Sequence, residues 1–338
     1  LLEGRRLERF RREALAVARL QHPHIVPVFG VGEERGIHYY AMQFIEGDSL
    51  DRVLGEVRRL RGRASGAQDD SPGRGASPLS TTLAKTFLGM EVGDGSSTTV
   101  PPGQFPEPES EPSSLPVLSQ RPVRPSAGLP APSCFEGDAP GYFNAMARIG
   151  VQVSEALAYS HAQGILHRDI KPANIIIDRT GRPWVADFGL SKALDGEDIT
   201  QSGEIVGTLR YMAPERLHGQ SDPRSDVYSL GATLYELTTL EQVHPGGDRA
   251  LLMRRIAEEM PALPRDIEPS IPGDLQAIVL KAIAKKPEAR YATAGDLARD
   301  LERFLGGDPP AARAEMLRLA SRAAKGSPRR RIALGVSA

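Results

Sequence analysis

Three short motifs in a fixed order constrain this chain of 338 residues more than any other feature. Residues 167–174 read His-Arg-Asp-Ile-Lys-Pro-Ala-Asn, and they are followed by Asp187-Phe188-Gly189 and then by Ala213-Pro214-Glu215. Either triplet alone would carry almost no information. All three in this order and at this spacing are very hard to obtain by chance, so the motifs decide the interpretation of the chain.

The residue types in these motifs suit phosphoryl transfer from a nucleotide. That chemistry needs a group that orients the attacking hydroxyl, together with oxygen ligands for Mg²⁺. Asp169 fits the first role, and Asn174 and Asp187 fit the second because Mg²⁺ prefers hard oxygen ligands. The motifs resemble the catalytic loop, the magnesium-binding triplet and the activation-segment triplet of the eukaryotic-type (Hanks-type) protein kinases. The resemblance runs from Leu7 to Leu305 but fails in residues 62–140.

The resemblance implies an α+β fold, the protein kinase-like two-lobed fold, with an incomplete small lobe of one helix and two strands and a mainly helical large lobe. It divides the chain into four segments. These are a partial small lobe with hinge and helix D (1–61), a disordered insert (62–140), the large lobe (141–305) and a basic tail (306–338).

Two features resemble the serine/threonine branch of the family, Lys171 and the run Gly207–Met212. In that branch the lysine contacts the transferred phosphate, and Thr208 is expected to hydrogen-bond near Asp169 and Lys171. The resemblance therefore implies a signalling kinase of bacterial type. It would transfer the γ-phosphate of ATP, with Mg²⁺ or alternatively Mn²⁺, to serine and threonine hydroxyls of protein substrates, and it would autophosphorylate through self-association.

The first segment has the spacing of an amphipathic helix followed by two strands. Apolar residues three or four apart form the helical stripe, namely Leu7, Phe10, Ala14, Val17 and Ala18. Two strand-like runs follow, Ile25–Val31 and Ile37–Phe44, separated by the turn-prone residues 32–36. By resemblance the helix is helix C, and Glu13 is the residue that pairs with the nucleotide-positioning lysine. Without the resemblance, Glu13 would be a solvated helix-face charge.

The chain departs from the family before this helix. A complete kinase carries a glycine-rich loop and a strand lysine there, and residues 1–12 contain neither. Two explanations compete, a truncated kinase and a natural pseudokinase that serves as a non-catalytic scaffold or regulatory binding module. We expect truncation, because pseudokinases tend to lose residues of the chemical step and here all four candidates are present: Asp169, Lys171, Asn174 and Asp187. The chain by itself would then be a weak or inactive enzyme.

The hinge of the family would follow the second strand. Met42 matches the gatekeeper position, and the backbone of Gln43 and Ile45 would read the edge of adenine. Asp48 and Ser49 lie where the ribose would rest, although turn chemistry explains these residues equally well.

Regulation by phosphate is implied by Arg168, which directly precedes Asp169. In the family this arginine marks kinases whose activation segment is held by a phosphate-to-arginine contact, and a phosphate suits a guanidinium. Thr200 and Ser202 are the candidate phosphate acceptors.

The resemblance also assigns structural roles. His167 and Phe188 would stack in a hydrophobic column that Val17 and Val28 complete. Two polar anchors are expected in addition. Asp226 would accept hydrogen bonds from the catalytic-loop backbone, or else cap its helix, and Glu215 would form a buried ion pair with Arg290.

Composition decides the interpretation of the insert. Residues 62–140 are rich in Pro, Ser, Gly and Thr, and such a segment cannot bury enough apolar surface to offset its ordering entropy. We therefore expect a disordered insert. Its more apolar stretch, Leu79–Val92, allows two interpretations, docking on the rest of the protein or a flexible loop with transient contacts, and we expect the second.

Net charge and cysteine content exclude several other classes. The net charge of −1 gives no basic field for nucleic acid, and the single cysteine, Cys134, excludes an internal disulfide and fits a reducing compartment. In the tail, Arg329–Arg331 precede the apolar residues 332–336, too few to span a membrane. The pattern fits either the approach to an anchor after residue 331 or a basic terminus. We expect a cytoplasmic kinase domain, attached in the first case to the inner face of the plasma membrane.

Overall fold

The computed structural model describes residues 12, 14–35, 37–62, 77–90, 141–188, 204–246 and 248–326, without the side chains of 204–206 and 319–326. Three candidate site residues, Glu13, Thr200 and Ser202, lie outside the described residues, as do Gly189 and the tail from residue 327.

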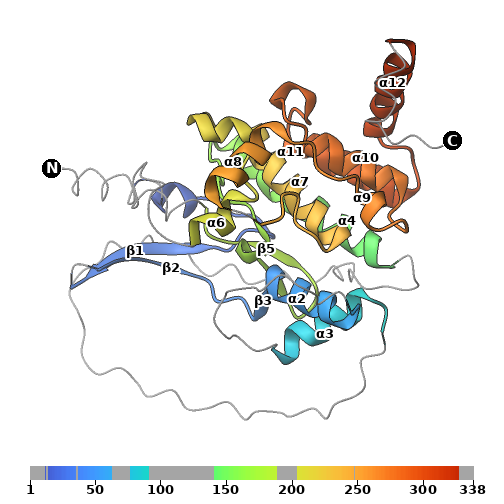
Figure 1. Ribbon diagram of the computed structural model, residues 1–338. Helices are drawn as coiled ribbons and strands as arrows, with labels where there is room; N and C mark the ends of the chain where they lie inside the picture. The colour runs from blue at the N-terminus through green and yellow to red at the C-terminus, as the bar shows by residue number, and fades with distance from the viewer. Residues whose placement is uncertain are drawn as a thin grey trace.

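Within these described ranges, five short strands form two separate antiparallel sheets (Figure 1). One sheet pairs β1 (Val28–Glu34) with β2 (Ile37–Met42). The other has the order β3 (Gly47–Ser49), β4 (Ile175–Asp178) and β5 (Pro183–Val185), so it joins the segment after the hinge to the chain between the first two motifs.

The first strand differs from its predicted position. β1 continues through Glu34, because Gly32 pairs with Tyr39 and Glu33 pairs with His38, so the predicted turn at 32–36 shrinks to its last residues. Ile25 was predicted to begin this strand, but it forms an isolated parallel bridge with Val185 instead. The bridge holds the start of this segment against β5.

The rest of the described chain is mainly helical (Figure 1). The α-helices are α2 (Leu50–Leu60), α3 (Pro78–Phe87), α4 (Gly141–Ala162), α6 (Glu204–Leu209), α7 (Pro223–Thr239), α8 (Arg249–Glu258), α9 (Pro264–Ile267), α10 (Gly273–Ala282), α11 (Ala294–Gly306) and α12 (Ala311–Gly326). Three 3-10 helices lie between them, at Pro172–Asn174, Pro214–His218 and Pro287–Ala289.

The core of the large lobe forms around α4 and α7. α4 has a buried apolar stripe, in which Ile149, Val153 and Leu157 are fully inaccessible. α4 packs against α7 and α11, and α7 packs against α10. α7 is buried along almost its whole length, so it forms the centre of the lobe. This arrangement confirms an α+β fold with a helical large lobe and few strands.

A helix forms inside the segment that was expected to be disordered. α3 begins at an N-cap, Ser77, whose hydroxyl accepts a hydrogen bond from the Ser80 backbone. Its side chains Leu83, Ala84 and Phe87 are buried in the main core, and the helix packs against α2 and α4. For residues 77–90 the expectation of transient contacts is therefore wrong, because a local apolar stripe lies within a polar segment.

The predicted amino-terminal helix is described only in part. Residues 14–17 are helical, and Ala14 and Val17 are buried in the main core as the stripe predicts. At the other end, α12 extends the described chain to Gly326. Among the described residues, the helices are all too short or too polar to cross a membrane.

Candidate active site

The loop that carries the first motif is held from below by Asp226. This residue lies in the first turn of α7, whose cap is Asp222, so Asp226 is the buried anchor and not the cap. Its Oδ2 accepts from the His167 backbone N–H and its Oδ1 from the Arg168 N–H, each at 2.8 Å. His161 Nε2 lies 2.8 Å from Oδ2. The anchor predicted from the sequence is confirmed.

These contacts explain the charge state of Asp226. Burial by itself would raise the pKa of this carboxyl, but the hydrogen bond from His161 and the backbone donor at His167 outweigh it, so the pKa lies below its ordinary value. An ionised carboxylate in the core therefore receives the donors that it needs, and the loop above it is fixed.

Asp169 is surrounded by the other polar residues of its motif. Lys171 Nζ lies 3.0 Å from Asp169 Oδ2 and also donates to Thr208 Oγ1 at 3.0 Å. Asn174 Nδ2 donates to both the carbonyl and the Oδ2 of Asp169, at 2.8 and 3.0 Å. The structure thus brings Asp169, Lys171, Asn174 and Thr208 together, although Thr208 comes from a different part of the chain.

His167 is buried as a neutral imidazole. Its Nδ1 accepts from the Asp169 backbone N–H at 3.2 Å, so Nε2 carries the proton and donates to the Ala186 carbonyl at 2.9 Å. Burial lowers the pKa of His167, which agrees with the neutral form. Its ring lies 4.5 Å from that of Phe188. The predicted stacking is confirmed, and Val17 belongs to the same core, with Val28 packed against it.

The candidate metal ligands are Asn174 and Asp187. The backbone N–H of Ala186 donates to the Asn174 carbonyl at 2.9 Å, which places Asn174 beside the residue before Asp187. Because Nδ2 of Asn174 is committed to Asp169, its Oδ1 is the atom left to act as a ligand. One amide oxygen and one carboxylate are hard donors of the kind that Mg²⁺ takes from protein, so the residues fit this ion. No described group of three or more His, Cys, Asp or Glu side chains forms a closed metal site.

The hinge candidates lie on and after β2. Gln43 donates its backbone N–H to the Pro27 carbonyl at 2.8 Å, which ties the end of β2 to the segment before β1. Met42 is partly exposed, whereas Ile45 is buried with Val26 and Ala186. Ser49 is the N-cap of α2 and makes no side-chain cap hydrogen bond.

Asp48, the other ribose candidate, is bound to protein side chains. Its buried carboxylate accepts from Arg52 Nη1 at 3.0 Å and from the hydroxyl of Ser77. The residue therefore ties β3 to α2 and to the start of α3. The alternative explanation for Asp48, a role in the turn, did not predict its contact with Ser77 either.

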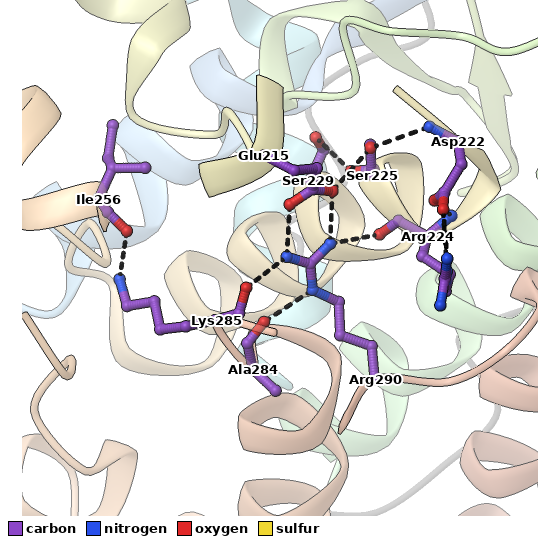
Figure 2. Close-up of polar contacts among 9 residues, drawn as sticks. All are labelled: Glu215, Asp222, Arg224, Ser225, Ser229, Ile256, Ala284, Lys285 and Arg290. Carbon is purple, nitrogen blue, oxygen red and sulfur yellow. Dashed lines mark hydrogen bonds and ion pairs between the residues drawn. The ribbon is translucent and has the colours of Figure 1, made fainter. Parts of the chain in front are cut away.

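Behind the loop, the predicted Glu215–Arg290 pair is confirmed (Figure 2). The two guanidinium nitrogens Nη1 and Nη2 each lie 2.7 Å from a Glu215 oxygen. The remaining donors reach the carbonyls of Ala284, Arg224 and Lys285. Every N–H of a side chain with no exposed surface is thus satisfied. Burial would raise the pKa of Glu215, but the bonds from Arg290 and Ser225 lower it.

Sequence reasoning missed two contacts at the site. The hydroxyl of Tyr40, on β2, donates to Asp187 Oδ1 at 2.5 Å. Arg216 donates from Nη1 to the carbonyl of Arg168, whose φ of 65° lies in the left-handed region. Arg216 could have been noticed because it directly follows the third motif. Nothing in the sequence marks Tyr40.

Comparison with known proteins agrees with the geometry. Residues 142–300 match the family model described as protein kinase domain. The chain is 30% identical over 315 residues to the probable serine/threonine-protein kinase SCO3848 of Streptomyces coelicolor, a match that covers 91% of this chain and 35% of that protein. It is 44% identical over 161 residues to the serine/threonine-protein kinase PknB of Mycobacterium tuberculosis, with 47% of this chain and 26% of that protein covered.

The chain thus spans about a third or less of the length of these relatives. The matched region contains all three motifs and the anchors that hold them, Asp226 and the Glu215–Arg290 pair. The chain belongs to the eukaryotic-type (Hanks-type) family of serine/threonine protein kinases and is similar to bacterial members.

Proposed function

We propose that the protein transfers the γ-phosphate of ATP to serine and threonine hydroxyls of other proteins. In this proposal Asp169 orients the attacking hydroxyl and accepts its proton, while Lys171 contacts the transferred phosphate. Asn174 and Asp187 would hold Mg²⁺, or Mn²⁺ in its place, which neutralises charge on the phosphates when bound. Met42, Gln43, Ile45 and Ser49 would line the nucleoside, and Glu13 would pair with the nucleotide-positioning lysine.

The observation that carries the proposal is the position of Lys171. Its ammonium lies between the Asp169 carboxylate and the Thr208 hydroxyl, at 3.0 Å from each. A cation held beside the base has the right sign to attract a phosphate, and Thr208 belongs to the run that resembles the serine/threonine branch. These contacts support a serine/threonine specificity.

Regulation and location form a further part of this proposal. We assign Arg168 to a phosphate on Thr200 or Ser202, formed by autophosphorylation between associated copies. We assign the kinase domain to the cytoplasm, attached to the inner face of the plasma membrane by an anchor after residue 331. The support is the Arg329–Arg331 cluster next to apolar residues. Cell fractionation that finds the intact protein only in the soluble fraction would contradict the attachment.

The direct test is Asp169→Asn in the intact protein. General-base assistance is worth about 100- to 10,000-fold, so turnover should fall by that factor while nucleotide affinity changes little. Asp308→Asn, at an exposed aspartate between α11 and α12, is the matched control and should keep full turnover. If the unaltered protein binds nucleotide but has no activity that Asp169→Asn can remove, the non-catalytic scaffold replaces the kinase as the conclusion.

A further inference from the structure

The contact between Tyr40 and Asp187 joins two parts of the molecule that no motif connects. Tyr40 lies in the middle of β2, in the two-stranded sheet, and Asp187 follows β5. The phenol oxygen lies 2.5 Å from Asp187 Oδ1, a distance typical of a hydroxyl that donates to an ionised carboxylate. Within the described part of the chain, this is the hydrogen bond that holds the Asp187 side chain.

Strand geometry explains why Tyr40 and not its neighbour reaches the site. Successive side chains of a strand point to opposite faces. Tyr39 is 44% exposed, whereas Tyr40 is only partly exposed and packs against the main core.

The backbone conformation of Asp187 explains why the contact with Tyr40 matters for the orientation of the carboxylate. Its φ of 57° lies in the left-handed region, which a non-glycine residue adopts only when its surroundings hold it there. On one side Phe188 is fixed by stacking against His167. The backbone is therefore set, but the Asp187 carboxylate is exposed to solvent and can rotate unless a side chain restrains it. Tyr40 supplies that restraint by engaging Oδ1.

We propose that Tyr40 is a positioning residue for the metal ligand Asp187. Its hydroxyl orients the carboxylate so that Oδ2 is presented to the divalent cation, and it makes the β1–β2 sheet part of the metal site. The inference rests on the proposed function, because it assumes that Asp187 binds the cation of a nucleotide complex. Partners that orient metal ligands commonly contribute about 10- to 100-fold to metal affinity.

The experiment compares Tyr40→Phe with Tyr39→Phe in the intact protein. Each change removes one hydroxyl and keeps the ring, and the two positions are adjacent on one strand. For Tyr40→Phe, the Mg²⁺ concentration that gives half-maximal kinase rate at saturating ATP should rise about tenfold. The rate at saturating Mg²⁺ should change less than about twofold, since Asp169 and Lys171 are untouched. Tyr39→Phe should match the unaltered protein in both.

A second readout does not depend on turnover. Mn²⁺ binding in the presence of ADP, followed by the loss of the free-ion electron paramagnetic resonance signal, should weaken about tenfold in Tyr40→Phe and not in Tyr39→Phe. Equal Mn²⁺ affinity of the two variants would overturn the inference, whatever the activity. A protein without kinase activity in which only Tyr40→Phe weakens Mn²⁺ binding would refute the proposed function and support the role of Tyr40.

Discussion

The two sides of the active site are built differently. The floor of the site, which we define as residues 161–174 with Asp226 and the Glu215–Arg290 pair, is held by buried side chains that each make several hydrogen bonds, namely His167, Asn174, Asp226 and Arg290. The hinge side, which we define as β1, β2 and residues 43–49, leaves large apolar side chains such as Phe29 and Ile37 exposed. It reaches Asp187 through one phenol. The floor is thus preorganised, whereas the hinge side can adjust.

The largest test of this contrast is Arg290→Met. The change leaves the Glu215 carboxylate without its partner inside the protein, so the free energy of unfolding should fall by about 3 to 5 kcal/mol. Arg299→Met is the control, because Arg299 pairs with Asp296 at an exposed site and should lose less than about 1 kcal/mol. Urea unfolding measures both. Losses of equal size would mean that the floor is no better anchored than the surface.

A pH series tests the floor further, through His244. Its ring is buried, Nε2 lies 3.2 Å from Lys285 Nζ, and the Lys285 carbonyl accepts from Arg290. Burial first, and then the charges of Lys285 and Arg255, lower the pKa of His244 to about 4. The unfolded chain binds this proton near pH 6.5 and the folded chain only near pH 4. Stability is therefore lost as pH falls through that window, on the order of 2 kcal/mol by pH 4.5.

The pKa of His22 is also lowered, to about 4, by burial and by His24. The free energy of unfolding of the whole protein should therefore fall by more than the contribution of His244 alone. His244→Gln should remove only its own share of the decline. Free energies of unfolding at pH 7 and pH 4.5 give the comparison. An unchanged decline in His244→Gln would show that this ring titrates normally and that the floor tolerates its charge.

The smallest effect is expected at Ser77, which contacts the hinge side through Asp48. This hydroxyl caps α3 and also donates to Asp48, so Ser77→Ala should cost about 1 kcal/mol. The control is Thr82→Ala on the exposed face of α3, where the hydroxyl donates only to the Pro78 carbonyl of its own helix. Thermal unfolding of both variants is the measurement. A loss of 3 kcal/mol or more at Ser77 would place α3 with the strongly anchored floor and remove the contrast.

The residues that sequence predicted best are those whose neighbours are fixed by a motif. Asp226, Glu215 and Arg290 were assigned partners correctly because each lies in a recognisable run. In these cases the information lies within a short window of sequence.

The predictions that failed concern contacts whose information does not lie within a short window of sequence. The prediction for the insert relied on the average composition of residues 62–140, which is polar. That average does not reveal the short apolar stripe formed by Leu83, Ala84 and Phe87. The partner of Tyr40 lies on a distant strand, so strand alternation could place the ring inside but could not name what it binds. Asp48 was misjudged for the same reason, since Ser77 comes from the insert. Glu13, Thr200 and Ser202 stay predictions.

The position of α3 also matters for anyone who wishes to shorten the protein. Deleting residues 62–140 as a single loop would remove the apolar side chains of α3 that cover α2 and α4. Because the newly exposed apolar surface favours aggregation, the yield of soluble protein should fall. A shortened gene that retains residues 77–90 and removes the stretches on either side would keep the apolar faces of α2 and α4 covered.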